Sequence, residues 1–224
     1  MPNLTVRIII LVIIGLLAGS VQADPKSKVP RTGQVLCYPD SPGLAPPPIP
    51  CDGTGQDGEI QAGVEWPSPR FRDNGDGTIR DGLTKLTWLK NANCLATSGL
   101  GPFDDTDGAP DDGMVFWQTA LDFANALESG QCGLSDGSDA GDWRLPNVRE
   151  LHSLIDYGQL EPAIPVGHPF TNLQEQGAYY SATSDENATA RAWFVSFFDG
   201  IVFLSFKTMG DFHAIAVTGG NVAD

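Results

Sequence analysis

The sequence predicts an α+β domain in which two helices pack on a short-stranded antiparallel sheet. Three observations carry this prediction: an amphipathic run from Met114 to Ser129, a capped helix start at Asn147, and a series of short apolar runs near the end of the chain. Two helices followed by consecutive strands is the element order of an α+β domain.

The first predicted helix covers Met114 to Ser129 and ends at Gly130. Apolar residues recur in it at helical spacing and would form one buried face. The residues of this face are Trp117, Ala120, Leu121, Ala124 and Leu127.

The second helix follows a short strand within the run GDWRLPNVRELHSLIDYG. Residues 143–145 alternate as in a half-buried strand, and Pro146 prevents the strand from continuing. Asn147 then occupies an N-cap position, and Glu150 completes a capping box three residues later. Gly158 is the predicted end of this helix.

Short strands make up the rest of the domain. The turn signal Asn74–Gly77 lies between Phe71 and Ile79 and predicts a hairpin, with a further strand over Lys85 to Lys90. Asp199-Gly200 predicts a second tight hairpin. The late strands are expected at Ala178–Thr183, Arg191–Phe198, Ile201–Lys207 and Phe212–Thr218.

Residues 1–23 have the pattern of a secretory signal peptide. Arg7 supplies the positive charge, Ile8 to Ala18 form an apolar core of eleven residues, and Val21–Ala23 form a small-residue cleavage site. An uncleaved anchor is the alternative, but a membrane-spanning helix needs roughly 20 apolar residues. We therefore expect an exported protein that is periplasmic, at the cell surface or extracellular, with no membrane span after cleavage.

The remaining chain divides into an arm over residues 24–68 and one domain over residues 69–224. The arm is rich in Pro and Gly and has too few apolar residues to form a core. We interpret it as a disulfide-stapled arm that lies on the main domain or links protomers. A free flexible linker is the alternative.

Four cysteines in an exported chain predict two disulfides, for which three pairings exist. Proximity in the sequence favours Cys37 with Cys51 and Cys94 with Cys132. Metal binding is disfavoured, because neither pair has the Cys-x-x-Cys spacing of a zinc site.

The chain is strongly acidic. Loss of Arg7 with the signal peptide leaves 12 basic and 28 acidic side chains, a net charge of −16. Such a field repels nucleic acids, anionic membranes and sulfated glycans. Neutral sugars, proteins or a ligand bridged by a cation remain as binding partners.

Four segments resemble, in their order, the Lcl C-terminal domain family, secreted bacterial domains named after a collagen-like adhesin. The family signature covers Trp143, Arg144, Leu145, Pro146 and Glu150. The segments are PRFRDNGDGTIRDGLTKLTWLKNANC (69–94), CGLSDGSDAGDWRLPNVREL (132–151), GHPF (167–170) and AWFVSFFDGIVFLSFK (192–207).

A weaker likeness to formylglycine-generating enzymes and C-type lectin-like domains implies a C-type lectin-like fold. The chain departs from the family pattern at residues 180–183 and at residues 217–220, where the usual late arginine is missing. A cationic site at this second position is therefore not expected.

Clustered aspartates are the candidate metal ligands, with calcium as the cation that carboxylate oxygens suit best. One group is Asp73 and Asp76, for which a simple turn is the alternative. The other group lies in the Asp104–Gly113 loop, and the alternative is that this loop is solvated and binds no metal. Its carboxylates are Asp104, Asp105, Asp107, Asp111 and Asp112.

Catalysis is disfavoured. No cysteine follows Cys132, whereas formylglycine-generating enzymes work through late cysteines, and His152, His168 and His213 show no metal or triad spacing. We expect a non-catalytic module for adhesion to a glycan or protein, and a second copy of the chain is a further candidate partner. The alternatives are a structural subunit of an exported assembly and an uncharacterised enzyme of formylglycine-generating-like fold.

Three loops are the candidate binding edge of such a module: Asp104–Gly113, Asp136–Asp142 and Asp185–Ala190.

Overall fold

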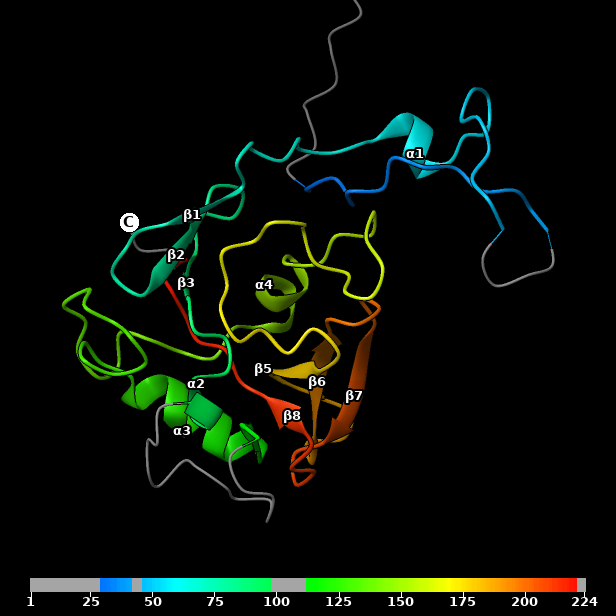
Figure 1. The fold of residues 1–224 in the computed structure, drawn as a ribbon. Helices are drawn as coiled ribbons and strands as arrows, with labels where there is room; N and C mark the ends of the chain where they lie inside the picture. The colour runs from blue at the N-terminus through cyan, green and yellow to red at the C-terminus, as the bar shows by residue number, and fades with distance from the viewer. Residues whose placement is uncertain (1–28, 42–45, 98–111, 221–224) are drawn as a thin grey trace, which may run out of the picture.

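The computed structural model describes residues 29–41, 46–97 and 112–220. The architecture is α+β, with two small sheets and four short helices in the described ranges. Figure 1 shows α4 in the middle of the body, with the second sheet below it and the first sheet to one side. The predicted class is therefore correct at the level of α+β.

The first sheet has the strand order β1-β2-β3-β9, and all its pairs are antiparallel. The turn between its first two strands is the predicted one, since the Asn74 amide donates to the Thr78 carbonyl at 3.1 Å. The strands are β1 (Phe71–Asp73), β2 (Thr78–Asp81), β3 (Thr87–Leu89) and β9 (Val217–Thr218).

The second sheet has the order β4-β8-β5-β6-β7 and is mixed, because β5 and β8 are parallel. A wholly antiparallel sheet was expected, so this part of the prediction is wrong. The strands are β4 (Met114–Val115), β5 (Ala178–Ser184), β6 (Arg191–Ser196), β7 (Val202–Phe206) and β8 (Phe212–His213).

The predicted last strand, Phe212–Thr218, is in fact two strands in different sheets. Phe212 and His213 pair with β4, whereas Val217 pairs with Trp88 in the first sheet. The chain crosses between the sheets through buried residues 214–216. This crossing joins the two sheets into one body.

The two longest helices differ from their predicted bounds. The helices are α1 (Asp57–Ile60), α2 (Cys94–Thr97), α3 (Trp117–Ala126) and α4 (Val148–His152). α3 begins three residues late because Met114 and Val115 pair with β8. α4 is capped by Asn147 as predicted but ends at His152, with Ser153 as its C-cap, well before Gly158.

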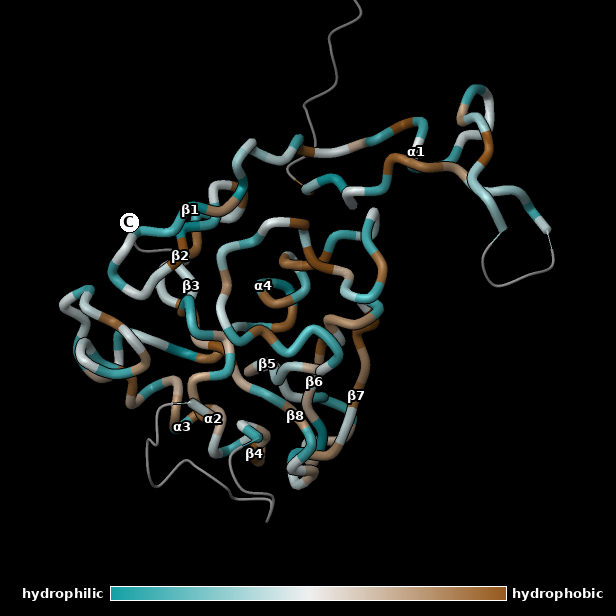
Figure 2. Tube along the Cα trace, in the orientation of Figure 1, coloured by the Kyte–Doolittle hydropathy of each residue, from teal (hydrophilic) through white to brown (hydrophobic). Residues whose placement is uncertain are grey.

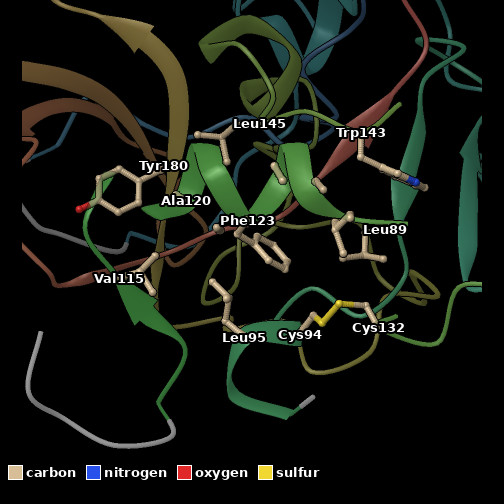
Figure 3. Packing of buried hydrophobic residues seen from close by; sticks show 14 of the residues in the cluster. Leu89, Cys94, Leu95, Val115, Ala120, Phe123, Cys132, Trp143, Leu145 and Tyr180 are labelled. Atoms are coloured by element: carbon tan, nitrogen blue, oxygen red, sulfur yellow. A yellow bond between two sulfur atoms is a disulfide. The ribbon is translucent and has the colours of Figure 1, made fainter. Parts of the chain in front are cut away.

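Two apolar cores lie on opposite sides of the second sheet. The first packs α3 on Tyr180 and Phe194, together with Trp143 and Leu145 (Figure 3). The second packs Leu151 of α4 against residues of β5 and β6 such as Val195. The side-chain alternation in β6 thus places successive residues in different cores.

Both expected disulfides are present. Cys94 and Cys132 have a Cα separation of 5.5 Å, and their bond lies under α3 at the edge of the first core (Figure 3). Cys37 and Cys51 have a Cα separation of 5.2 Å and close a loop of the arm. Each disulfide therefore belongs to a different part of the structure.

The arm is attached to the main domain at its base. The Tyr157 amide donates to the Thr32 carbonyl at 2.9 Å, and the Arg70 guanidinium lies 4.6 Å from the ring centroid of Trp66. Beyond this base the arm extends past the body, and hydrophilic and hydrophobic stretches alternate along it (Figure 2). Across the described ranges, no helix is both long and apolar enough to cross a membrane.

Candidate functional site

The family signature has a structural role. Arg144 forms two 2.7 Å hydrogen bonds with Glu150 and a third of 2.9 Å with the Gly219 carbonyl. Glu150 also accepts from the Asn147 amide at 2.8 Å, which completes the capping box of α4. The hydrogen bonds that Arg144 donates to the Glu150 carboxylate raise the pKa of Arg144. These contacts tie α4 to the end of β9.

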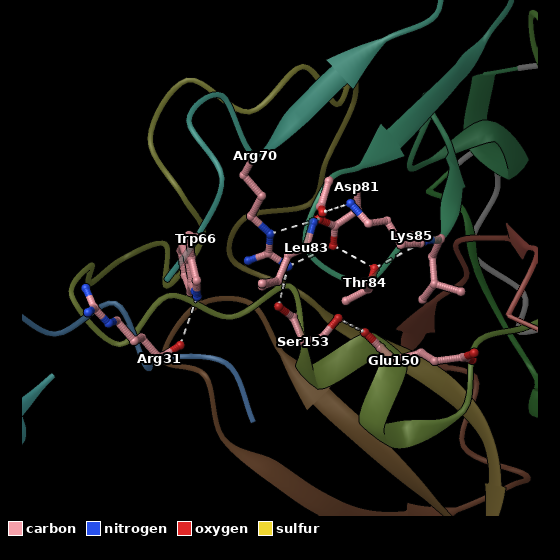
Figure 4. Close-up of polar contacts among 11 residues, drawn as sticks. Arg31, Trp66, Arg70, Asp81, Leu83, Thr84, Lys85, Glu150 and Ser153 are labelled. Carbon is pink, nitrogen blue, oxygen red and sulfur yellow. Dashed lines mark hydrogen bonds and ion pairs between the residues drawn. The ribbon is translucent and has the colours of Figure 1, made fainter. Parts of the chain in front are cut away.

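A second polar cluster connects the first sheet to α4 (Figure 4). The buried guanidinium of Arg70 donates to Asp81 at 2.9 Å and to the Ser153 carbonyl at 2.6 Å. Asp81 also accepts from the Leu83 amide and the Thr84 hydroxyl, each at 2.8 Å. A buried charge with this many partners holds the hairpin in place.

The candidate binding site is a polar pocket of about 530 Å³ on the first sheet. This volume is in the range of small-ligand sites. Five separate parts of the chain meet in it: the β1–β2 turn, the residues after β3, the end of α2, the loop after α3, and the segment between α4 and β5. Its lining is Gly75, Gly77, Lys90, Asn91, Thr97, Cys132, Gly133 and Thr171.

Backbone contacts hold the walls of this polar pocket. The Thr171 amide donates to the Lys90 carbonyl at 2.9 Å, and the Ala92 amide donates to the Thr171 carbonyl at 2.9 Å. Gly77 has φ +86°, and a Cβ there would lie 2.3 Å from the Gly133 carbonyl oxygen. Only glycine permits this close approach.

Side-chain hydrogen bonds fix the donors and acceptors of the pocket. Asn91 donates to the Thr97 hydroxyl at 2.8 Å and accepts from Asn172 at 3.0 Å. Lys90 is 2.6 Å from Asp73, and this hydrogen bond lowers the pKa of the Asp73 carboxyl. The pocket therefore presents fixed, uncharged amide and hydroxyl groups with one neutralised ion pair beside them.

Some of the aspartates predicted as calcium ligands lie in the described part of the chain, and each of these accepts a hydrogen bond within a turn. Asp73 accepts from the Gly75 amide, Asp76 from the Thr78 amide and hydroxyl, and Asp112 from the Met114 amide. Asp104, Asp105, Asp107 and Asp111 lie outside the described residues. In the rest of the chain, no three His, Cys, Asp or Glu side chains are grouped to hold a metal ion.

The other two predicted loops contact different parts of the domain. The Asp136–Asp142 loop lies beside Gly219 at the end of β9, around a pocket of about 440 Å³. In the Asp185–Ala190 loop, Asp185 forms a 2.5 Å ion pair with Arg191. Burial alone would raise the pKa of Asp185, but the Asn187 amide and Arg191 lower it overall.

The histidines lie apart from the polar pocket. His152 contacts the Tyr157 hydroxyl at 2.7 Å, His168 lies 3.8 Å from Glu175, and His213 is buried beside Tyr179. Burial lowers the pKa of all three imidazoles.

Sequence reasoning missed Asn91, Thr97 and Thr171 as site residues. The sequence held only weak signals for them. Asn91 lies near the end of the family-like segment 69–94, and Thr97 lies just beyond it. Thr171 follows the GHPF segment directly.

The sequence around this pocket is similar to one known protein family. A model described as the Lcl C-terminal domain matches residues 77–218, which is more than half of the chain. The chain belongs to the Lcl C-terminal domain family. No curated protein and no solved structure was found to match it. The family match includes the β1–β2 turn from Gly77, the disulfide and the whole second sheet, so most of the polar pocket is part of the Lcl C-terminal domain.

Proposed function

We propose that this Lcl C-terminal domain is an exported, non-catalytic binding module that holds a neutral polar ligand, a glycan or a protein loop, in its polar pocket. The observation that carries the proposal is the pocket itself. It has ligand-sized volume, walls fixed by backbone hydrogen bonds, and uncharged donors and acceptors at its surface. Rigid polar groups of this kind give orientation and specificity to a bound ligand.

The charge of the chain supports a neutral ligand. The net charge of −16 without residues 1–23 repels polyanions. Lys90, the cation among the described lining residues, is already paired with Asp73. A sulfated glycan would therefore meet no free cation in the described lining.

The chemistry of the lining supports binding without catalysis. Cys132 is oxidised in the disulfide, so it is not a nucleophile. Lys90 is the ionisable side chain among the described lining residues, and its ion pair disfavours a role as a base. A C-type lectin-like arrangement is part of the same proposal, supported by the short helices and disulfide-stapled loop around two small sheets.

The test is a binding panel with the oxidised protein, residues 24–224, at physiological salt. Neutral and sulfated glycans are compared, once with calcium and once with chelator. We expect neutral glycans to bind and sulfated ones not to bind. A requirement for calcium would assign the ligand contacts to the aspartate loops, and binding of sulfated glycans alone would refute the proposal.

Matched variants locate the site. Thr171 lines the pocket and is exposed, so Thr171→Trp should fill the pocket and abolish binding without unfolding the protein. Thr189 is also exposed but lies in the Asp185–Ala190 loop, so Thr189→Trp should leave affinity unchanged. The reverse result would place binding at that loop.

A structural subunit is the second candidate, and the arm favours it. Val35 and Ile60 of the arm are 60% and 61% exposed, and exposed apolar side chains on one segment are available for contact with another protein. Deletion of residues 24–68 should then reduce oligomer size. An unchanged oligomer would exclude this role.

A further inference from the structure

The outer edge of the second sheet is open. β7 is the last strand in the order β4-β8-β5-β6-β7, and Figure 1 shows it at the periphery of the body. Its sequence, Val-Phe-Leu-Ser-Phe, contains no charge, glycine or proline. Edge strands in soluble proteins are normally protected by such residues or by a covering element.

The hydrogen-bond register determines which backbone groups of β7 face outward. The Ile201 carbonyl accepts from Ser196, and the Lys207 amide donates to Ala190, each at 2.9 Å, so the residues at these positions face β6. Phe203 and Ser205 lie between these two positions and pair with Phe194 and Ala192, so they also face β6. The N–H and C=O groups of Val202, Leu204 and Phe206 therefore point away from the sheet.

Most of these outward groups have no partner within the described part of the chain. Of these groups, only the Phe206 carbonyl has a partner among the described residues, since it accepts from the Met209 amide at 3.1 Å. Unpaired backbone groups beside apolar side chains favour pairing with another extended chain. The neighbouring side chains are also exposed, with Phe206 at 56% and Ile201 at 54%.

The other described sheet edges are less suited to strand addition. β1 carries the charged residues Arg72 and Asp73. β4 and β9 each contain two residues, too few for a stable pair. β7 is thus the long uncharged edge of the described sheets.

We infer that β7 pairs with β7 of a second copy of this chain, antiparallel and across a two-fold axis at Leu204. This register places Val202 opposite Phe206 of the second copy, so each copy offers the same outward groups to the other. The edge is self-complementary, and its lack of charge means that no like charges meet within the strand pair. The inference does not depend on the proposed ligand site, which lies on the first sheet.

The small buried area and the net charge of the chain both make this dimer weak. A single pair of short strands buries less than about 1,000 Å², so the dimer is weak and depends on concentration. The two copies also repel through their net negative charge. Added salt screens this repulsion and should strengthen the dimer.

Sedimentation velocity of residues 24–224 over a concentration series tests the inference. We expect a monomer–dimer equilibrium that shifts toward dimer with added salt. Leu204→Lys places two like charges opposite each other at the axis and should weaken the dimer by more than about tenfold. Val166, which is 84% exposed and lies outside both sheets, provides the control Val166→Lys, which should not change the equilibrium.

Hydrogen exchange gives a second readout that does not depend on how the variants fold. The Val202 and Leu204 amides should gain protection in the wild-type protein as its concentration rises, while the Phe203 amide stays protected throughout. A monomer at all concentrations would overturn the inference. A dimer in which the β7 amides still exchange freely would also overturn it. So would β7 amides that become protected only when an extended peptide is added.

Discussion

Arg144 and Glu150 are joined by two parallel hydrogen bonds between guanidinium and carboxylate, each 2.7 Å long. The same carboxylate caps α4 through the Asn147 amide. The family signature therefore stabilises the junction of α4 with β9, and the signature residues are not among those that line the polar pocket.

Replacement of Glu150 tests this structural role. Glu150→Ala should lower the free energy of unfolding by about 1–2 kcal/mol, because it removes half of the capping box and the partner of Arg144. The ion pair itself contributes little of this, since the Arg144 side chain is 36% exposed. Urea unfolding measures the change. Glu186→Ala, at an exposed position, should have almost no effect.

The buried pair Arg70–Asp81 should contribute more to stability. Asp81→Ala leaves the Arg70 charge buried against Ser153 and should destabilise the protein by about 3–5 kcal/mol. Arg72, two residues after Arg70 and within β1, is exposed, so Arg72→Ala serves as the matched control. Equal effects of the two substitutions in urea unfolding would contradict the assigned role of the pair.

The two disulfides should separate stability from binding. Cys94→Ser/Cys132→Ser opens a loop of 38 residues, for which loop entropy gives about 4 kcal/mol, and removes one wall of the polar pocket. Cys37→Ser/Cys51→Ser opens a loop of 14 residues in the arm, with a cost of about 3 kcal/mol. Calorimetry should show both losses, whereas glycan binding should disappear only in the first variant. Loss of binding in the arm variant would mean that the arm contributes to the site.

Stability should fall as the pH decreases below neutrality. Burial lowers the pKa of His213, although the Gly113 carbonyl and the Asp112 charge partly oppose this. In the unfolded chain this imidazole binds a proton near pH 6.5, while the folded protein keeps it neutral. The unfolded state then binds more protons, so the stability present above about pH 6.5 is lost as the pH falls through the folded pKa. His152 and His168 act in the same direction.

Urea unfolding of His213→Gln between about pH 8 and pH 5 checks this assignment. The variant should show a shallower decrease in stability than the wild-type protein. His152→Gln, at a more exposed position, should change the slope less. Identical slopes for wild type and His213→Gln would exclude His213 as a source of the pH dependence.

Local signals in the sequence predicted the parts of the fold that depend on neighbouring residues. Asn147 with Glu150 located the start of α4, and Asn74–Gly77 located the first hairpin, because caps and turns are set within a few residues. The start of α3 and the split of the last strand depend on pairing between Met114 and His213, which lie far apart in the sequence. Residues 214–216 are apolar throughout, so no turn residue marks the split.

The polar pocket could not be predicted for a similar reason. Asn91, Thr97, Cys132 and Thr171 meet only because the disulfide and the Asn91–Thr171 bridge bring distant segments together. The aspartates are charged and clustered, a pattern that predicts metal ligands from the sequence alone. Those that the structure describes mainly hydrogen-bond to nearby turns.

The most direct test of the account is the mapping, by NMR of the oxidised protein, of the amides that shift when a glycan from the binding panel is added. The account predicts shifts at Gly75, Asn91, Gly133 and Thr171, with the Arg144 and Glu150 signals unchanged. Shifts confined to the Asp136–Asp142 or Asp185–Ala190 loops would contradict it, as would the absence of any shift across the neutral glycans.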